Sequence, residues 1–293
     1  MLNNIRLENI LVHVLLSCFI IFNSCSFFSK DNIQIIDNYF TGEKLYFSDL
    51  DKNYKKSKNF SKIWSKIHSK RFRSYHKFLD KKFMIIGESK ILDKNFVIIK
   101  DKKNRLYKSI VKTDTSGNII LPSHLLLEKH YKNAKKLIDK EIWLNFTNNN
   151  KIFYSNSNHN ISRFSKVKVT GLIKYQDGEN YLPLWLKIKY RKNIDGLVRY
   201  CPTQDNVGFE DHYFTEEPLP RLWGDEMIDL ILKGETIIGM AEDQLRKSIG
   251  NPDMINKTSS RYGMSEQWIY VEKDSKSKTF YQFEYGKLVY VNK

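Results

Sequence analysis

The chain of 293 residues is poor in cysteine, glycine and proline, with 3, 13 and 6 of them respectively. Two of the cysteines, Cys18 and Cys25, lie in or just after an apolar run near the N-terminus, which leaves Cys201 for a folded domain. One thiol forms neither an internal disulfide nor a cysteine-based metal cluster, so we expect Cys201 to pack as a small apolar residue. So few glycines also leave no glycine-rich loop that could hold a phosphate.

Histidines in metal-binding arrangements are missing as well. His68 and His76 are eight residues apart in a basic segment, and His124 and His130 are six apart with no acidic cluster beside them. Only His212 has acidic neighbours, and it lies in a segment without periodicity. We therefore predict no metal ion, no cofactor and no catalytic residue. The alternative, an enzyme with a site in the β-rich region, has no motif to support it.

Long hydrophobic runs are absent except at residues 10–22. As a helix this run is roughly 20 Å long, which is too short for a hydrocarbon core of about 30 Å. Its length and its polar end predict a lipoprotein signal peptide over residues 1–24, with Cys25 as the lipid-attachment residue. Cys18, which follows two leucines and a serine, is the alternative acylation site. An uncleaved anchor, or a signal without lipid, is the other interpretation.

A signal of this kind predicts a place in the cell envelope. The residues after Cys25 are uncharged up to Ser29, and no aspartate follows the cysteine directly. By resemblance to lipoprotein sorting, this pattern indicates the outer membrane, with a lipid-anchored chain that faces the periplasm.

Acidic residues are too few to balance the basic ones, with 33 Asp or Glu against 49 Lys or Arg and a net charge of +16. Residues 51–112 contain 20 Lys or Arg and 5 Asp or Glu. Such a block normally suggests nucleic acid, but the predicted export excludes that partner. Anionic lipid headgroups, lipopolysaccharide or a wall polymer are the polyanions that remain. A solvated basic surface without a ligand is the alternative.

Residues 25–76 are predicted to be a tether that ends in a basic amphipathic helix. Phe60, Ile63, Trp64 and Ile67 share one helical face and have lysines around them. Such a helix can lie on a membrane surface or cap the domain that follows.

Residues 77–192 are predicted to be a β-rich, barrel-like region, because apolar and polar residues alternate in segments such as 82–87, 95–100 and 166–174. One helix is expected over residues 122–138. The segments 78–85 and 137–144 share an apolar and charged pattern, which suggests tandem units, with chance as the alternative. Residues 193–224 have prolines and glycines but little periodicity and are predicted to be a linker.

Residues 225–293 have the sharpest pattern. Two helices are expected over 225–232 and 241–249, with Gly234 and Gly250 at their ends, followed by three strands. This segment resembles the SmpA/OmlA (BamE-like) family. The matching residues are Ile231, Gly239, Met240, Glu242, Asp243, Gln244, Leu245, Gly250, Pro252, Trp268, Tyr270, Phe283, Gly286 and Leu288. In family members the connection between the first helix and the Gly-Met pair is usually shorter than in this chain, which has the additional segment 234–238 there.

The resemblance implies two helices against a three-stranded antiparallel sheet, and a domain without catalysis that docks onto an envelope protein. The whole chain is then an α+β protein. Aromatic residues alternate along the expected strands, so Trp268 and Tyr270, with Met240 and Phe283, are candidate partner-binding residues. We therefore predict a non-enzymatic outer-membrane lipoprotein that binds an envelope protein, with outer-membrane assembly as the process that the resemblance suggests. The alternative is a polyanion-binding protein that uses the basic β-rich region.

Overall fold

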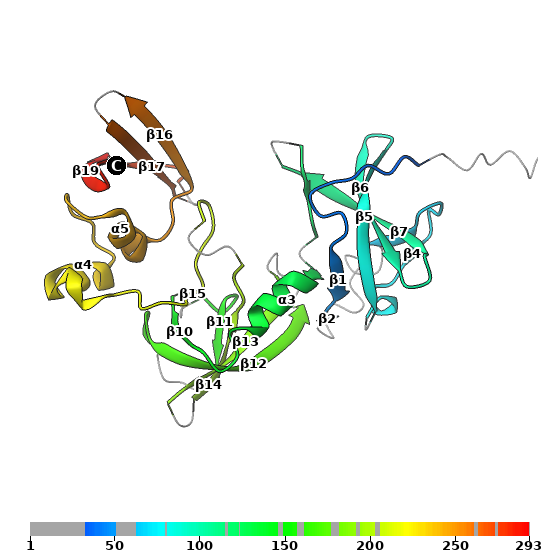
Figure 1. Ribbon diagram of the computed structural model, residues 1–293, viewed down its shortest axis with the longest axis horizontal. Coiled ribbons are helices and arrows are strands. Elements are labelled where there is room, and N and C mark those ends of the chain that lie inside the picture. The colour runs from blue at the N-terminus through cyan, green and yellow to red at the C-terminus, as the bar shows by residue number, and fades with distance from the viewer. Residues whose placement is uncertain are drawn as a thin grey trace, which may run out of the picture.

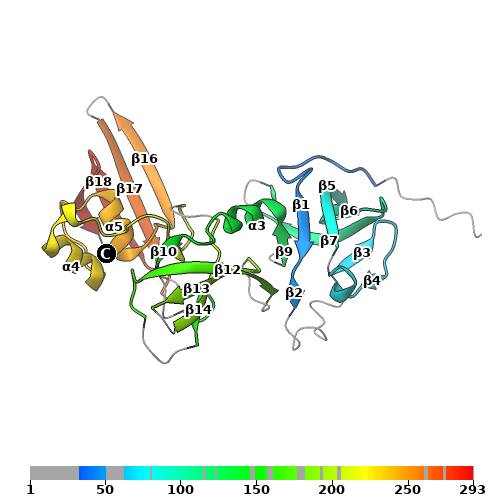
Figure 2. The same cartoon turned by 60° about the horizontal axis from the view of Figure 1, so that its bottom comes forward.

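The computed structural model describes residues 33–50, 63–79, 81–114, 117–122, 124–145, 149–156, 161–176, 182–191, 194–202, 206–260, 263–272 and 275–292. Within these ranges the chain forms nineteen strands and three α-helices, so it is mostly β and the prediction of an α+β fold is wrong. Three sheets follow one another along the long axis (Figures 1 and 2). The predicted signal peptide, Cys18 and Cys25 lie outside the described residues.

The first sheet has the strand order β4-β3-β7-β6-β5-β1-β9, with β8 beside β7. Alternating residues of these strands, together with the aromatic rings of Phe47, Trp64 and Phe78, form one core. The strands are β1 (Lys44–Phe47), β3 (Trp64–Lys66), β4 (Phe72–Arg73), β5 (Lys82–Ile91), β6 (Lys94–Asp101), β7 (Leu106–Thr113), β8 (Ile119–Ile120) and β9 (Leu125–Leu127).

The predicted basic helix near residue 64 is not present in the described part of that segment. Trp64 begins β3, which pairs with β7 through Ser65 and Lys66, and its ring lies 5.6 Å from that of Phe47. The short 3₁₀ helix η1 (Tyr75–Lys77) follows β4. Apolar spacing at three and four residues is compatible with a helix in isolation, but pairing with a strand far along the chain decides otherwise. The predicted helix spans residues 52–76, of which residues 52–62 lie outside the described residues.

The second sheet has the order β11-β14-β13-β12-β10-β15, with the short β2 (Asp49–Leu50) parallel to β12. The other strands are β10 (Glu141–Leu144), β11 (Phe153–Ser155), β12 (Lys166–Gln176), β13 (Leu184–Tyr190), β14 (Ile194–Arg199) and β15 (Tyr213–Phe214). Helix α3 (Glu128–Lys135) is shorter than the predicted helix because residues 125–127 pair with β1 as β9. The predicted linker, 193–224, contributes β14 and β15 to this sheet.

The C-terminal part has α4 (Asp225–Lys233) and α5 (Glu242–Ile249), followed by a sheet in the order β16-β17-β18-β19. These strands are Met254–Ser260, Gly263–Val271, Lys278–Glu284 and Lys287–Asn292. The predicted two-helix, three-stranded domain is therefore wrong, because the sheet has four strands. β16 and β17 pair in antiparallel register from Met254 with Ile269 to Ser260 with Gly263, where the prediction placed a single strand.

Arg163 joins the second sheet to the C-terminal part. Its Nε donates to Asn145 Oδ1 at 2.7 Å, and its terminal nitrogens donate to the carbonyl oxygens of Ser248 at 3.0 Å and Lys247 at 2.7 Å. Both carbonyls belong to the last turn of α5, where unpaired carbonyl oxygens favour a cation. Among the described residues, no helix has the length and apolar character that crossing a membrane requires.

Candidate anion-binding site

The predicted partner-binding residues meet in the core of the C-terminal part. Trp268, Met240 and Phe283 are at most 1% exposed, and the rings of Trp268 and Phe283 are 4.6 Å apart. The Arg246 guanidinium of α5 lies 4.4 Å from the centre of the Trp268 ring, which fixes that ring between the helix and the sheet. These three side chains therefore build the domain, and they have no free surface for a partner.

Tyr270 lies on the same inner face of the sheet. Its hydroxyl donates to the carbonyl oxygen of Gly250 at 2.9 Å, and burial raises the pKa of Tyr270 above its ordinary value. The bond attaches the strand to the end of α5, so Tyr270 also has a role in packing. Alternation along the strand was visible in the sequence, but which face the helices cover was not.

Two histidines, His124 and His212, and Cys201 lie in the interior of the first two sheets. His124 Nε2 accepts a hydrogen bond from Trp64 Nε1 at 3.2 Å, and burial lowers the pKa of His124 to about 3. His212 is buried with Nδ1 2.9 Å from the carbonyl oxygen of Arg199, and the buried Cys201 thiol lies 3.5 Å from the carbonyl oxygen of Glu210. Within the described ranges, no three His, Cys, Asp or Glu side chains are grouped so that they could hold a metal ion.

Basic residues from the edge of the first sheet gather around a groove. One part of it, about 360 Å³, is lined by Lys66 of β3, Ser69, Arg71, Phe72 and Arg73 of β4, Ser74, and Lys77 of η1. Four of these residues are cations, two have hydroxyl groups, and none has a carboxylate. The phenyl ring of Phe72, 42% exposed, supplies a flat apolar surface beside the charges.

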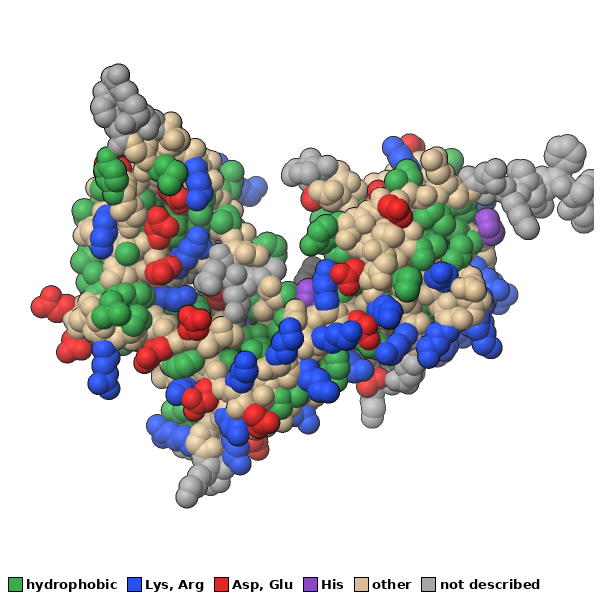
Figure 3. Space-filling model, viewed as in Figure 1, with side chains coloured by type: hydrophobic (Ala, Val, Ile, Leu, Met, Phe, Trp, Pro, Cys, Tyr) green, Lys and Arg blue, Asp and Glu red, His purple; other side chains and the backbone are tan. Residues whose placement is uncertain are grey.

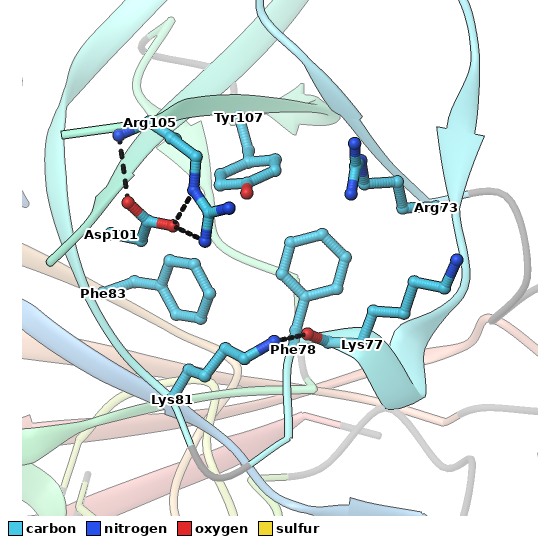
Figure 4. A pocket seen from close by; sticks show the side chains of 8 residues that line it. All are labelled: Arg73, Lys77, Phe78, Lys81, Phe83, Asp101, Arg105 and Tyr107. Carbon is cyan, nitrogen blue, oxygen red and sulfur yellow. Dashed lines mark hydrogen bonds and ion pairs between the residues drawn. The ribbon is translucent and has the colours of Figure 1, made fainter. Parts of the chain in front are cut away.

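A second part of the groove, about 180 Å³, shares Arg73 and Lys77 with the first. It is also lined by Lys81 and Arg105, by the rings of Phe78, Phe83 and Tyr107, and by Asp101. Figure 4 shows Arg73 and Arg105 on opposite sides of Tyr107, with Phe78 between Arg73 and Lys81. We call both parts together the basic groove, with Lys66, Arg71, Arg73, Lys77, Lys81 and Arg105 as its cations.

The one carboxylate of the basic groove is already neutralised. Asp101 accepts hydrogen bonds from Arg105 Nε at 2.7 Å and from the backbone N–H groups of Lys103 and Arg105, both at 2.9 Å. Burial alone would raise the pKa of Asp101, but these hydrogen bonds lower it below its ordinary value. Asp101 therefore stays ionised and orients Arg105. Because its charge is balanced by Arg105, it attracts the other cations of the groove only weakly.

Within the described part of the chain, the remaining cations of the basic groove have no acidic partner. Among the described residues, no ion pair joins Lys66, Arg71, Arg73 or Lys77 to a carboxylate. Lys81 donates to the backbone carbonyl of Lys77, which places a fifth cation at the edge. Like charges held this close repel one another, so an anion that enters the groove relieves repulsion as well as gaining attraction.

The sequence indicated the basic block over 51–112 but not the groove. The prediction places Lys66, Arg71 and Arg73 in one helix, where they would point in several directions, and Lys77 in the β-rich region that follows. The turn between β3 and β4 and the start of η1 bring them to one surface instead. Figure 3 shows Lys and Arg side chains continuing along the lower edge of the molecule, from the second sheet to the first.

Comparisons of this chain with protein-family models, with curated proteins and with solved structures find no match.

Proposed function

We propose that this protein is a non-enzymatic, lipid-anchored protein of the outer membrane that binds phosphate-bearing glycolipid, of the lipopolysaccharide type, in its basic groove. The observation that supports the proposal most is the part of the groove lined by Lys66, Arg71, Arg73 and Lys77 without any carboxylate. In this proposal the signal peptide directs the chain to the cell envelope, and the lipid on Cys25 anchors it to the membrane.

The chemistry of the groove suits phosphate groups better than a single small anion. Guanidinium groups bind phosphate oxygens through two parallel hydrogen bonds, whereas ammonium groups act as point charges. Arg71 and Arg73 offer the first kind of contact, and Lys66 and Lys77 the second. Ser69 and Ser74 add hydroxyl donors, and Phe72 can pack against a sugar ring or an acyl chain.

A charge-matched pair of variants tests this proposal. In the groove variant, Arg71→Gln, Arg73→Gln and Lys77→Gln remove three charges from the groove. In the control variant, Lys135→Gln, Lys187→Gln and Lys189→Gln remove three charges from exposed positions on α3 and β13. With purified lipopolysaccharide as the probe, we expect at least tenfold weaker binding by the groove variant and less than threefold by the control. Equal losses in the two variants would show that net charge alone drives binding.

The anchor has its own test. Labelling with a palmitate analogue should mark the wild-type protein and a Cys18→Ala variant but not a Cys25→Ala variant, which should leave the membrane fraction. Label that is retained in Cys25→Ala and lost in Cys18→Ala would move the lipid to the alternative cysteine.

A second candidate function is docking onto an envelope protein through the C-terminal part, as its resemblance to the SmpA/OmlA family suggests. Exposed apolar side chains in and after α4 favour it: Leu232, Ile237 and Ile238 are 50%, 42% and 59% exposed. Ile237 and Ile238 lie in the segment that family members usually lack. A photo-crosslinker at position 238 should capture one membrane protein in stoichiometric yield, and a crosslinker at Tyr39, an exposed residue that precedes β1, should not.

A further inference from the structure

The outer face of the C-terminal sheet, opposite to Trp268, has two adjacent rows of different chemistry. In one row the strand pairing places Asn256, Gln267, Gln282 and Tyr290 side by side across all four strands. In the next row it places Met254, Ile269, Phe280 and Asn292 side by side. Neighbouring strands are about 4.8 Å apart, so each row extends about 14 Å across the sheet.

This outer face is open to a ligand around Tyr290, whereas Ile269 in the second row is only 5% exposed. Helices α4 and α5 pack on the inner face, and α3 packs against β1, β9 and β12. Tyr290 is 60% exposed and Met254 51% exposed. Gln267, Phe280, Gln282, Tyr290 and Asn292 line a groove of about 280 Å³. Figures 1 and 2 show this sheet at the end of the molecule away from β4, which lines the basic groove.

The groove lining has no charged side chain, although 28% of the chain is charged. It offers amide groups instead, each of which is both donor and acceptor. Asn256 Nδ2 donates to Gln267 Oε1 at 3.3 Å, which aligns two amides and leaves their other donors and acceptors available. Beside the amides, the rings of Tyr290 and Phe280 supply apolar surface.

Sugar rings match this combination. A pyranose has hydroxyl groups around its rim, which pair with amide donors and acceptors, and C–H groups on its faces, which pack on aromatic rings. An anionic ligand would find no cation in the lining, and a wholly apolar partner would bury the amides without hydrogen bonds at a cost. We propose that the outer face of β16–β19 binds an uncharged oligosaccharide, with Tyr290 and Gln282 as its central contacts.

The test uses the mature full chain and three uncharged probes, maltohexaose, cellohexaose and hexa-N-acetylchitohexaose, in calorimetric titration and saturation-transfer NMR. We expect at least one probe to bind, with affinity unchanged between low and high salt. Tyr290→Ala and Gln282→Ala should each weaken binding at least tenfold. Tyr154→Ala is the matched control, because Tyr154 is 58% exposed on β11 of another sheet, and it should bind as wild type does.

Thermal unfolding of the same variants separates binding from folding, and the exposed Tyr290 predicts an unchanged midpoint. The inference is overturned if none of the three probes binds, or if Tyr154→Ala loses binding as strongly as Tyr290→Ala. It is also overturned if sugar binding falls in the groove variant with Arg71, Arg73 and Lys77 replaced. The lipopolysaccharide proposal does not depend on any of these outcomes.

Discussion

At the scale of single residues, Gly87 shows how tightly one backbone position can be constrained. It lies at a bulge in β5, with φ at +136°, where the pairing with β6 shifts between Ile85 and Gly87. A Cβ there would collide with the backbone carbonyl of Ile36, which bridges to Glu88. Only glycine fits both the conformation and the space.

We expect Gly87→Ala to lower the free energy of unfolding by roughly 3 kcal/mol, since both strain and collision oppose the methyl group. Gly42→Ala is the control, because Gly42 also has a positive φ but nothing within 4 Å of a Cβ. It should cost about 1 kcal/mol. Urea unfolding measures the loss of stability in both variants. If Gly87→Ala and Gly42→Ala lose the same free energy of unfolding, a shift of residues 35–36 relieves the collision.

His124 couples the stability of the first sheet to pH. Burial lowers its pKa to about 3 in the folded state, whereas an unfolded chain has a histidine pKa of about 6.5. Between these values the unfolded state binds a proton that the folded state does not. The free energy of unfolding therefore falls as the pH falls below about 6.5, and stability from this residue is complete above that pH.

The expected loss from His124 between pH 7 and pH 5 is about 2 kcal/mol. His124→Gln keeps an acceptor for Trp64 Nε1 but does not titrate. Between pH 7 and pH 5 the free energy of unfolding of this variant should therefore fall by about 2 kcal/mol less than that of wild type. Urea unfolding at the two pH values gives the comparison. An identical pH dependence in wild type and variant would assign the effect to other groups, such as His212, whose pKa burial also lowers.

At the scale of elements, the end of α5 depends on Arg163. Burial lowers the pKa of Arg163 to about 10, which still leaves the guanidinium charged at pH 7. Its three hydrogen bonds join Asn145 to the last carbonyls of α5. The planar guanidinium group of Arg163 donates all three hydrogen bonds at once, which the single ammonium group of a lysine could not do in the same geometry.

We expect Arg163→Ala to lower the free energy of unfolding by roughly 3 kcal/mol and to speed amide hydrogen exchange in α5. Arg163→Lys should recover less than half of that loss. Exposed Arg191 serves as the control, and Arg191→Ala should leave both measurements as in wild type. Unchanged exchange in α5 of Arg163→Ala would show that other contacts hold the helix end.

At the scale of the whole molecule, the two proposed ligands bind to different sheets and by different forces. Lipopolysaccharide binding in the basic groove should weaken at least tenfold when salt rises from low to molar concentration, because screening acts on exposed charges. Saturation with a bound oligosaccharide should leave that affinity unchanged within twofold. A larger change would indicate coupling between the first and the C-terminal sheet, and binding at several salt concentrations measures both effects.

Much of the β structure could be predicted from local pattern. Segments 82–87 and 95–100 are short apolar runs and segment 166–174 alternates in polarity at its start, and the three lie in β5, β6 and β12. The basic groove could not be predicted, because the segment around Trp64 satisfies helical spacing as well as a strand. Its pairing with β7, more than 40 residues along the chain, decides the conformation.

The sequence by itself determined the net charge, the basic block over 51–112, the short apolar run and the alternation of the long strands. These are properties of composition and of local periodicity, and they do not depend on how the chain folds. Only the tertiary structure decided that Trp268 faces α5 while Tyr290 faces outward, and that Arg71, Arg73 and Lys77 share one groove. Both outcomes depend on which elements pack together, and packing is decided by contacts between residues far apart in the chain.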